Sequence, residues 1–81
     1  MYESVSQPID VLASFKKERV EPVIFKLANR YYHVKRVNLV HSERRGREKI
    51  TFFSVSDESN AYRLSFSSET LKWMLEESAT L

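Results

Sequence analysis

Large apolar residues occupy every second position in two short runs near the C-terminus of this 81-residue chain. These residues are Tyr62, Leu64 and Phe66 in the first run and Leu71, Trp73 and Leu75 in the second. Because side chains alternate between the two faces of a β-strand, all six can share one face of a sheet. The pattern therefore predicts an all-β domain whose core these two runs help to form.

Four earlier segments also have the alternation or the β-forming composition of strands. They are residues 9–15, 23–27, 31–40 and 49–55. Within the last of these, Phe52 and Phe53 must point to opposite faces, so we expect one of the two rings to be exposed. Together with the two C-terminal runs, these segments predict six strands.

The segment 31–40 changes the phase of its alternation. Its first half places apolar side chains at Tyr32 and Val34, and its second half places them at Val37 and Leu39. A β-bulge between the two halves would bring both pairs to the same face and would help a small sheet to curl. We therefore expect one long, bulged strand.

Turn residues separate the predicted strands. Asn29 tolerates the left-handed backbone conformation, and Gly46, the only glycine in the sequence, suits positive φ in a hairpin loop. Polar clusters at residues 57–60 and 67–70 indicate two further turns. Strands in this order predict a small six-stranded barrel or a strongly bent antiparallel meander sheet.

The last predicted element has a helical alternative, which would make the fold α+β. Residues 68–77 contain adequate helix formers, and Ser67 or Ser68 could cap a helix there. On a helix, however, Trp73 would lie about 200° from both Leu71 and Leu75. On a strand the three share one face, so we favour a strand.

A chain of this length supports one domain with a single modest core. We expect a flexible leader over residues 1–7, one β domain over residues 8–77 and a flexible tail over residues 78–81. Cysteine is absent, which excludes disulfides and thiolate metal sites. The sequence lacks a signal-peptide pattern and any apolar stretch of membrane-spanning length, so we expect a soluble cytoplasmic protein with no membrane partner.

Six short motifs resemble those of a known family when they are taken in order. The motifs are Pro8-Ile9-x-Val11, Pro22-x-x-Phe25, Asn29-Arg30-x-Tyr32-x-Val34, Phe53-x-Val55, Tyr62-x-Leu64 and Trp73-x-Leu75. The chain is similar in this respect, over about residues 8–77, to an uncharacterised family of small bacterial all-β domains. The resemblance implies a compact bacterial β module, and it implies no catalytic residue.

Charge is unevenly distributed along the chain. Residues 16–49 contain eleven basic and four acidic residues, a net charge of +7, whereas the remainder contains two basic and seven acidic residues, a net charge of −5. A basic region of this kind attracts phosphate groups or acidic partners if the charges also separate in space.

Basic and aromatic residues coincide around the predicted hairpin that contains Gly46. Those we assign to a nucleic-acid-binding surface are Lys35, Arg36, Arg44, Arg45, Arg47, Lys49, Tyr31 and Phe52. Small β domains bind single-stranded nucleic acid by stacking bases on aromatic rings while arginines contact phosphates. A second basic loop is expected at Lys16, Lys17 and Arg19. The alternative is that the aromatics belong to the core and the arginines only keep the hairpin tip soluble.

Signatures of an enzyme are absent from the sequence. His33, His41 and Glu43 match no standard metal-ligand spacing, and there is neither a nucleophile elbow nor a glycine-rich phosphate loop. We therefore predict a non-catalytic binding or accessory module without a metal or cofactor.

A protein partner, or a second copy of the chain, is the alternative to nucleic acid. Short edge strands pair readily with another chain. The surroundings of the exposed aromatics distinguish the two partners. An aromatic surrounded by Arg44, Arg47 and Lys35 favours nucleic acid, whereas one surrounded by valine and leucine favours protein.

Overall fold

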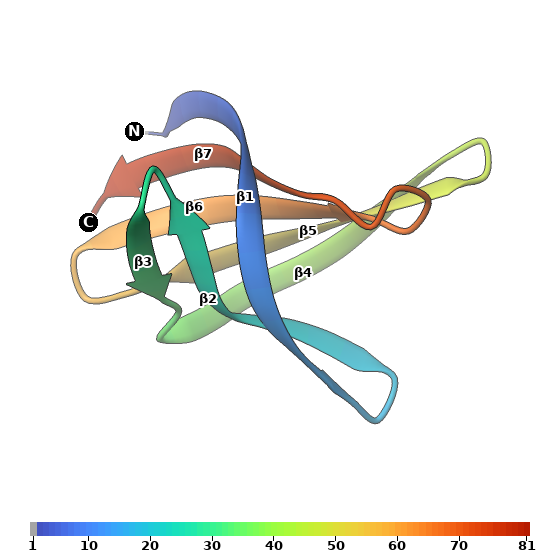
Figure 1. The fold of residues 1–81 in the computed structure, drawn as a ribbon, viewed down its shortest axis with the longest axis horizontal. Coiled ribbons are helices and arrows are strands. Elements are labelled where there is room, and N and C mark those ends of the chain that lie inside the picture. The colour runs from blue at the N-terminus through green and yellow to red at the C-terminus, as the bar shows by residue number, and fades with distance from the viewer. Residues whose placement is uncertain (1) are drawn as a thin grey trace.

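Residues 2–81, which the computed structural model describes, form one antiparallel sheet (Figure 1). Its strands are β1 (Glu3–Lys16), β2 (Arg19–Leu27), β3 (Arg30–His33), β4 (Arg36–Arg45), β5 (Glu48–Ser56), β6 (Asn60–Ser67) and β7 (Trp73–Thr80). The strand order across the sheet is β3-β2-β1-β7-β6-β5-β4. The described residues contain no helix. The all-β prediction is therefore confirmed, and the helical alternative for residues 68–77 is wrong.

The alternating C-terminal runs form the centre of the core. Leu64 on β6 lies opposite Phe53 on β5 and Leu75 on β7, so one layer of side chains crosses three strands. These three side chains are 0%, 1% and 2% exposed. Trp73 and Tyr62 are buried in the same cluster, and Phe66 packs against it partly buried. The shared face was predicted correctly for these residues.

Leu71 is the exception, because it is 69% exposed. It precedes β7 in a tight turn in which its N–H donates to the Ser67 carbonyl and the Ser67 N–H donates to the Lys72 carbonyl. These bonds hold Leu71 at a positive φ of 59°, outside the strand. The alternation at Leu71 therefore predicted its side-chain direction wrongly.

The expected long strand over residues 31–40 is also wrong, because the chain changes partner within it. The Val34 N–H donates to the Val23 carbonyl on β2 over 2.9 Å, whereas the Lys35 N–H donates to the Ser56 carbonyl on β5 over 3.0 Å. Consecutive residues thus join opposite sides of the sheet and separate β3 from β4. This break raises the number of described strands from the expected six to seven. A register shift does occur, but later, between Val37 and Leu39.

The sheet curls without closing into a barrel. β3 pairs only with residues 24–27 of β2, and β4 pairs with β5. No other strand among residues 2–81 covers the outer edge of β4. The six-stranded barrel is therefore not found, and the order departs from a simple meander because β1 lies between β2 and β7.

Both ends of the chain take part in the sheet. β1 begins at Glu3, which pairs with Ser78, and β7 continues to Thr80. The segments expected to form a leader and a tail therefore contain paired residues. A register shift between Ser4 and Gln7, with Ser6 at a φ of 51°, bends β1 near its start.

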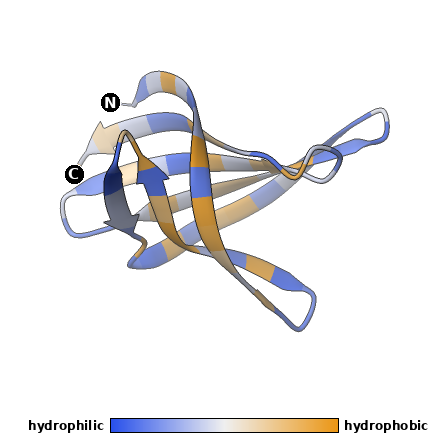
Figure 2. Cartoon of the chain, in the orientation of Figure 1, coloured by the Kyte–Doolittle hydropathy of each residue, from blue (hydrophilic) through white to orange (hydrophobic). Residues whose placement is uncertain are grey.

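Hairpin turns use positive φ, largely without glycine. Gly46 has a φ of 61° and Asn29 a φ of 65°, as predicted. Ala28, Lys17 and Glu18 also have positive φ, which two-residue hairpin turns of the primed types require. The sequence does not signal these three positions, because side chains other than Gly, Asn and Asp are uncommon there. Figure 2 shows that the tips of the β1–β2 and β4–β5 hairpins are hydrophilic, whereas the strand bodies carry alternating hydrophobic bands.

An aromatic cluster fills the concave side of the curl. Phe25 on β2 meets Tyr62 on β6 edge-on at 5.1 Å between ring centroids, and it stacks on Tyr32 of β3 at 5.0 Å. In the sheet, β1 and β7 lie between β2 and β6, so the contact of Phe25 with Tyr62 crosses the interior. Burial, together with the nearby Asp57 carboxylate, raises the pKa of Tyr62 above its ordinary value.

The two leucines of the last run provide a matched test of the fold. We expect Leu75→Ala to lower the free energy of unfolding by about 2–5 kcal/mol, because Leu75 is fully enclosed. Leu71→Ala removes the same atoms from an exposed turn and should change the free energy of unfolding by less than about 0.5 kcal/mol. Chemical denaturation of both variants measures the difference. Equal losses would contradict the placement of Leu71 outside the core.

The raised pKa of Tyr62 predicts a loss of stability at high pH. Above about pH 10, the ordinary tyrosine pKa, the unfolded chain releases this proton before the folded chain does. The free energy of unfolding should therefore fall as pH rises through the folded pKa. The stability of the Tyr62→Phe variant should fall less steeply than that of the wild type when thermal unfolding is followed between pH 8 and about pH 11. Parallel profiles would show that Tyr62 does not titrate differently in the two states.

Candidate binding surfaces

The residues predicted to bind nucleic acid are divided between the two ends of β4. Arg44, Arg45, Arg47 and Lys49 lie at the β4–β5 hairpin, whereas Lys35 and Arg36 lie at the start of β4 and Tyr31 lies on β3. A ten-residue strand spans about 30 Å. The structure therefore does not bring the predicted residues together into one surface.

Strand register further separates the basic residues of the hairpin. Phe53 points to the core, so Lys49, four residues earlier on β5, lies on the concave side of the sheet. Arg44 pairs with Lys49 and shares that side, while Arg45 pairs with Glu48 and lies on the convex side with Phe52. Arg44 and Lys49 are thus the hairpin cations that face the interior of the curl.

Phe52 is engaged by neighbouring side chains on the convex face. The ring of His41 stacks on it at 5.1 Å between centroids, and the Arg63 guanidinium lies 4.8 Å from the Phe52 centroid. Arg63 also donates to Glu77 over 3.4 Å. The ring is therefore not surrounded by Arg44, Arg47 and Lys35, the arrangement that would favour nucleic acid.

Tyr31 is exposed, but it lies in a different electrostatic setting. Its ring is 66% exposed, and the Lys26 ammonium lies 5.6 Å from its centroid. The shallow depression beside it is lined by Lys35 and also by Asp57 and Glu58. These carboxylates oppose binding of a phosphate backbone at this end of β4.

Glu43 partly neutralises the hairpin. Its carboxylate accepts from Arg45 over 3.2 Å and lies 3.5 Å from His41 Nε2. Hydrogen bonds with His41 and Arg45 lower the pKa of Glu43. Within the described part of the chain, His33 joins no cluster of three or more potential metal ligands, and neither does the pair of His41 with Glu43.

The fold unites two basic segments that are distant in sequence. The β1–β2 hairpin carries Lys16, Lys17 and Arg19, and it extends from the same end of the molecule as the β4–β5 hairpin, on the right of Figure 1. Arg19 pairs with Glu21 at 3.4 Å. The two hairpins form the walls of an opening that the sequence did not predict.

An apolar cleft of about 360 Å³ lies between these hairpins. Its apolar lining comes from four strands, with Val20 on β2, Val40 on β4, Phe53 on β5 and Phe66 on β6. Val40 is 48% exposed although it points to the concave side, because no neighbouring strand among residues 2–81 covers it. The signal in the sequence is weak, since Val20 lies within a charged stretch and Val40 ends a segment that reads as core.

Unpaired strand edges border the cleft on both sides. β4 is bonded to β5 along one edge, and β3 stops short of residues 19–22 of β2. In the described chain the facing edges of β2 and β4 therefore present backbone groups without a strand partner. Such edges are templates for pairing with another extended segment.

No helix among residues 2–81 has the length and hydropathy that crossing a membrane requires. In comparisons with known proteins, no family model matches the chain, and no curated protein or solved structure is similar to it. The resemblance to the uncharacterised bacterial family stays a prediction. The site must therefore be interpreted from its geometry.

Proposed function

We propose that this chain is a non-catalytic interaction module that binds an extended segment of another protein between β2 and β4. The proposal rests on one observation: two strand edges without partners border the same apolar cleft. Adding a strand to such an edge satisfies its backbone groups, and pockets beside the edge select the side chains of the ligand.

The cleft favours a particular pattern in the bound segment. Five antiparallel pairings separate β2 from β4, so these two strands run in opposite directions and a segment between them is antiparallel to one and parallel to the other. We expect the antiparallel pairing to be with β4, because an antiparallel ladder is slightly more stable per residue and the outer edge of β4 is the longer free edge. Its alternate side chains would face the concave side, where Val20, Val40 and Phe66 lie. These positions would be apolar, and burying them would remove Val40 from water.

Charge at the hairpin end sets the expected flank of the segment. Antiparallel pairing with β4 places the first residues of the ligand beside the tip, where Arg44 and Lys49 face the concave side. Neither of these two cations makes an ion pair within the described residues. Glu18 and Glu21 border the cleft on the β2 side and would repel an acidic residue there. We therefore expect an acidic residue only among the first residues of the ligand, beside Arg44 and Lys49.

Single-stranded nucleic acid is the second candidate. The observation that favours it is the approach of two basic hairpins to one opening, with Lys16 and Lys17 on one and Arg44, Arg47 and Lys49 on the other. Phosphate contacts from both hairpins would make binding strongly dependent on salt. The engaged ring of Phe52 provides no free stacking platform for a base, which ranks this candidate second.

A random peptide library displayed on phage provides a direct test. We expect it to yield peptides with alternating apolar residues and an acidic residue near the N-terminus, which bind the protein and shift the NMR resonances of β4 amides. Val40→Asp should weaken these peptides by about tenfold or more, since it places a charge against the apolar side of the ligand. Leu12→Asp is the matched control, because Leu12 is 63% exposed on β1 and lies outside the cleft.

Three outcomes would overturn the proposal. If the selected peptides bind the Val40→Asp variant as tightly as the wild type, the binding site lies elsewhere. Sedimentation as a dimer that Val40→Asp converts to a monomer would identify a second copy as the occupant. Salt-dependent binding of a thymidine oligonucleotide that Arg44→Ala and Lys49→Ala abolish, without any peptide binding, would establish the nucleic-acid function instead.

A further inference from the structure

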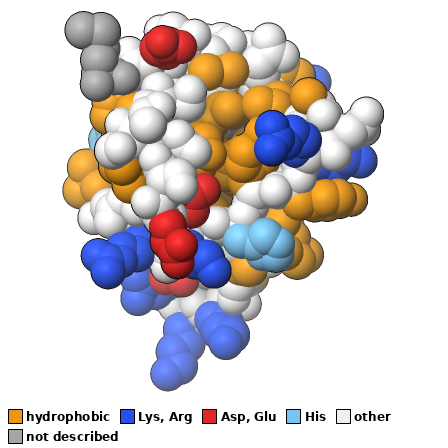
Figure 3. Space-filling model, turned by 90° about the vertical axis from the view of Figure 1, so that its left-hand side faces the viewer, with side chains coloured by type: hydrophobic (Ala, Val, Ile, Leu, Met, Phe, Trp, Pro, Cys, Tyr) orange, Lys and Arg blue, Asp and Glu red, His pale blue; other side chains and the backbone are white. Residues whose placement is uncertain are grey.

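A second cavity lies at the opposite end of the curled sheet, where both termini are found. Its volume is about 490 Å³, within the range of small-molecule sites. It shares no lining residue with the cleft between β2 and β4. Figure 3 looks onto this end and shows hydrophobic side chains gathered at the centre of the face.

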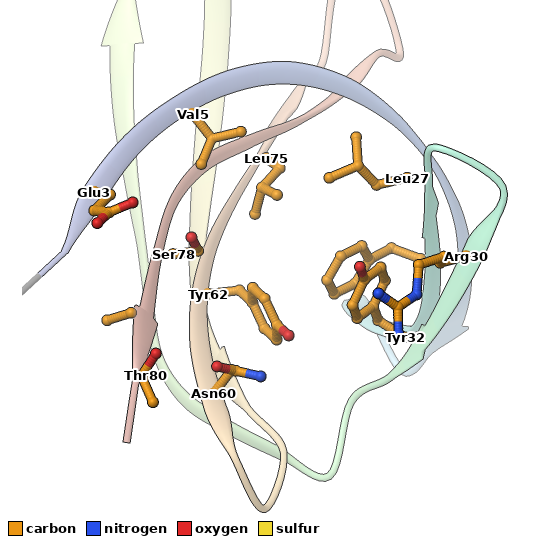
Figure 4. A pocket seen from close by; sticks show the side chains of 12 residues that line it. Glu3, Val5, Leu27, Arg30, Tyr32, Asn60, Tyr62, Leu75, Ser78 and Thr80 are labelled. Atoms are coloured by element: carbon orange, nitrogen blue, oxygen red, sulfur yellow. The ribbon is translucent and has the colours of Figure 1, made fainter.

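The arch of β1 creates the roof of this cavity. The bulge between Ser4 and Gln7 bends the strand, and Val5 points from it into the cavity (Figure 4). Leu27 from β2 extends the apolar surface beside Val5, with the buried Leu75 behind them. The two partly exposed aliphatic side chains, Val5 and Leu27, offer an apolar side that suits a hydrocarbon group.

Hydrogen-bond donors gather on another side of the same cavity. Arg30 from β3 enters beside Tyr32, and the Tyr62 hydroxyl and the Asn60 amide point towards the same region (Figure 4). Arg30 forms no ion pair with the described residues. Asp57 lies near Tyr62 and opposes an anion there, whereas the Arg30 guanidinium attracts one. An unpaired guanidinium beside a phenol and an amide can hold a carboxylate through several N–H and O–H bonds.

The aromatic cluster makes this donor group rigid. The Tyr62 ring is fixed edge-on against Phe25 at 5.1 Å and against Tyr32 at 5.7 Å. The Tyr62 hydroxyl is protonated at neutral pH, as an ordinary phenol is, and can therefore donate a hydrogen bond. A donor that is already oriented loses little entropy when a ligand binds.

Glu3 introduces selectivity at the far side of the cavity. Its carboxylate lies across from Arg30, next to Ser78 and Thr80 (Figure 4). A ligand with a single negative charge can place that charge beside Arg30 and away from Glu3. A ligand with a carboxylate at each end would bring its second charge towards Glu3, where like charges repel.

We propose that this cavity binds a small monocarboxylic acid, with its carboxylate held by Arg30, Tyr62 and Asn60 and its aliphatic chain against Val5 and Leu27. The site is independent of the proposed strand-binding cleft, so either can fail without the other. It assigns a ligand class to a cavity in which apolar and donor surfaces meet around a fixed aromatic cluster.

Titration with octanoate at neutral pH, followed by NMR of the full chain, tests the assignment. We expect saturable shifts for residues lining the cavity and little change at the β4–β5 hairpin. Suberate, which carries a carboxylate at both ends, and octanol, which carries none, should each bind at least about tenfold more weakly than octanoate. Equal binding of octanol would show that the carboxylate is not recognised and would overturn the proposal.

Two variants separate recognition from a general effect of charge. Arg30→Gln should weaken octanoate binding by about tenfold or more, because a charged hydrogen bond is lost from an exposed side chain. Lys26→Gln is the matched control: Lys26 pairs with Tyr31, one register step from Arg30, but lies on the convex face. Equal losses in the two variants would indicate only long-range attraction and would overturn the assignment.

A third variant fills the cavity. Ser78 lines it from β7 opposite Tyr62 and points into it (Figure 4), and Ser78→Phe should abolish octanoate binding by occupying the space of the ligand. Thermal unfolding of this variant confirms that it remains folded. A folded Ser78→Phe variant that binds octanoate as the wild type does would place the ligand elsewhere and contradict the proposal.

Discussion

Two consecutive backbone amides hold the curl of this sheet. The N–H of Val34 bonds to Val23 on β2, and the N–H of Lys35 bonds to Ser56 on β5. These strands belong to opposite halves of the sheet, so two successive peptide groups link its two sides directly. The link holds the two sides of the sheet together at one end only. β3 ends where His33 pairs with Ile24, so residues 19–22 of β2 have no partner strand on that edge. The cavity at the linked end and the cleft at the free end both follow from this asymmetry.

Local patterns predicted the parts of the fold that depend on local geometry. Alternation identified the buried faces of β6 and β7, and Asn29 and Gly46 marked positive φ correctly, because each depends on one or two residues. The change of partner at Val34 could not be predicted, since its cause is a pair of carbonyls more than ten residues away in each direction. Leu71 failed for a related reason: the hydrogen bonds of its turn override the alternation of its run.

The candidate sites were harder to predict than the fold, because each combines residues from distant strands. Sequence proximity joined Lys35 and Arg36 to the hairpin arginines, although a ten-residue strand separates them by about 30 Å. Conversely, Lys16 and Lys17 are distant from Arg44 in the sequence and were assigned to a separate loop, although their hairpins extend from the same end of the molecule. Basic residues concentrate in the strands that become the two edges of the sheet. The charge asymmetry of the sequence therefore becomes an asymmetry between its edges and its centre.

The two proposed sites differ in how far the protein is organised before binding. At the linked end, stacked rings and the crossing amides fix the donors around Tyr62, so a ligand meets a surface that is already formed. At the free end, the hairpin tips are exposed and the edges of β2 and β4 lack strand partners among the described residues, so fewer contacts hold their spacing. Closure of that gap would bury Val40 and complete the sheet that the chain itself leaves open. A rigid end suits a small ligand and an open end suits a polypeptide, and the two proposals differ on this physical ground.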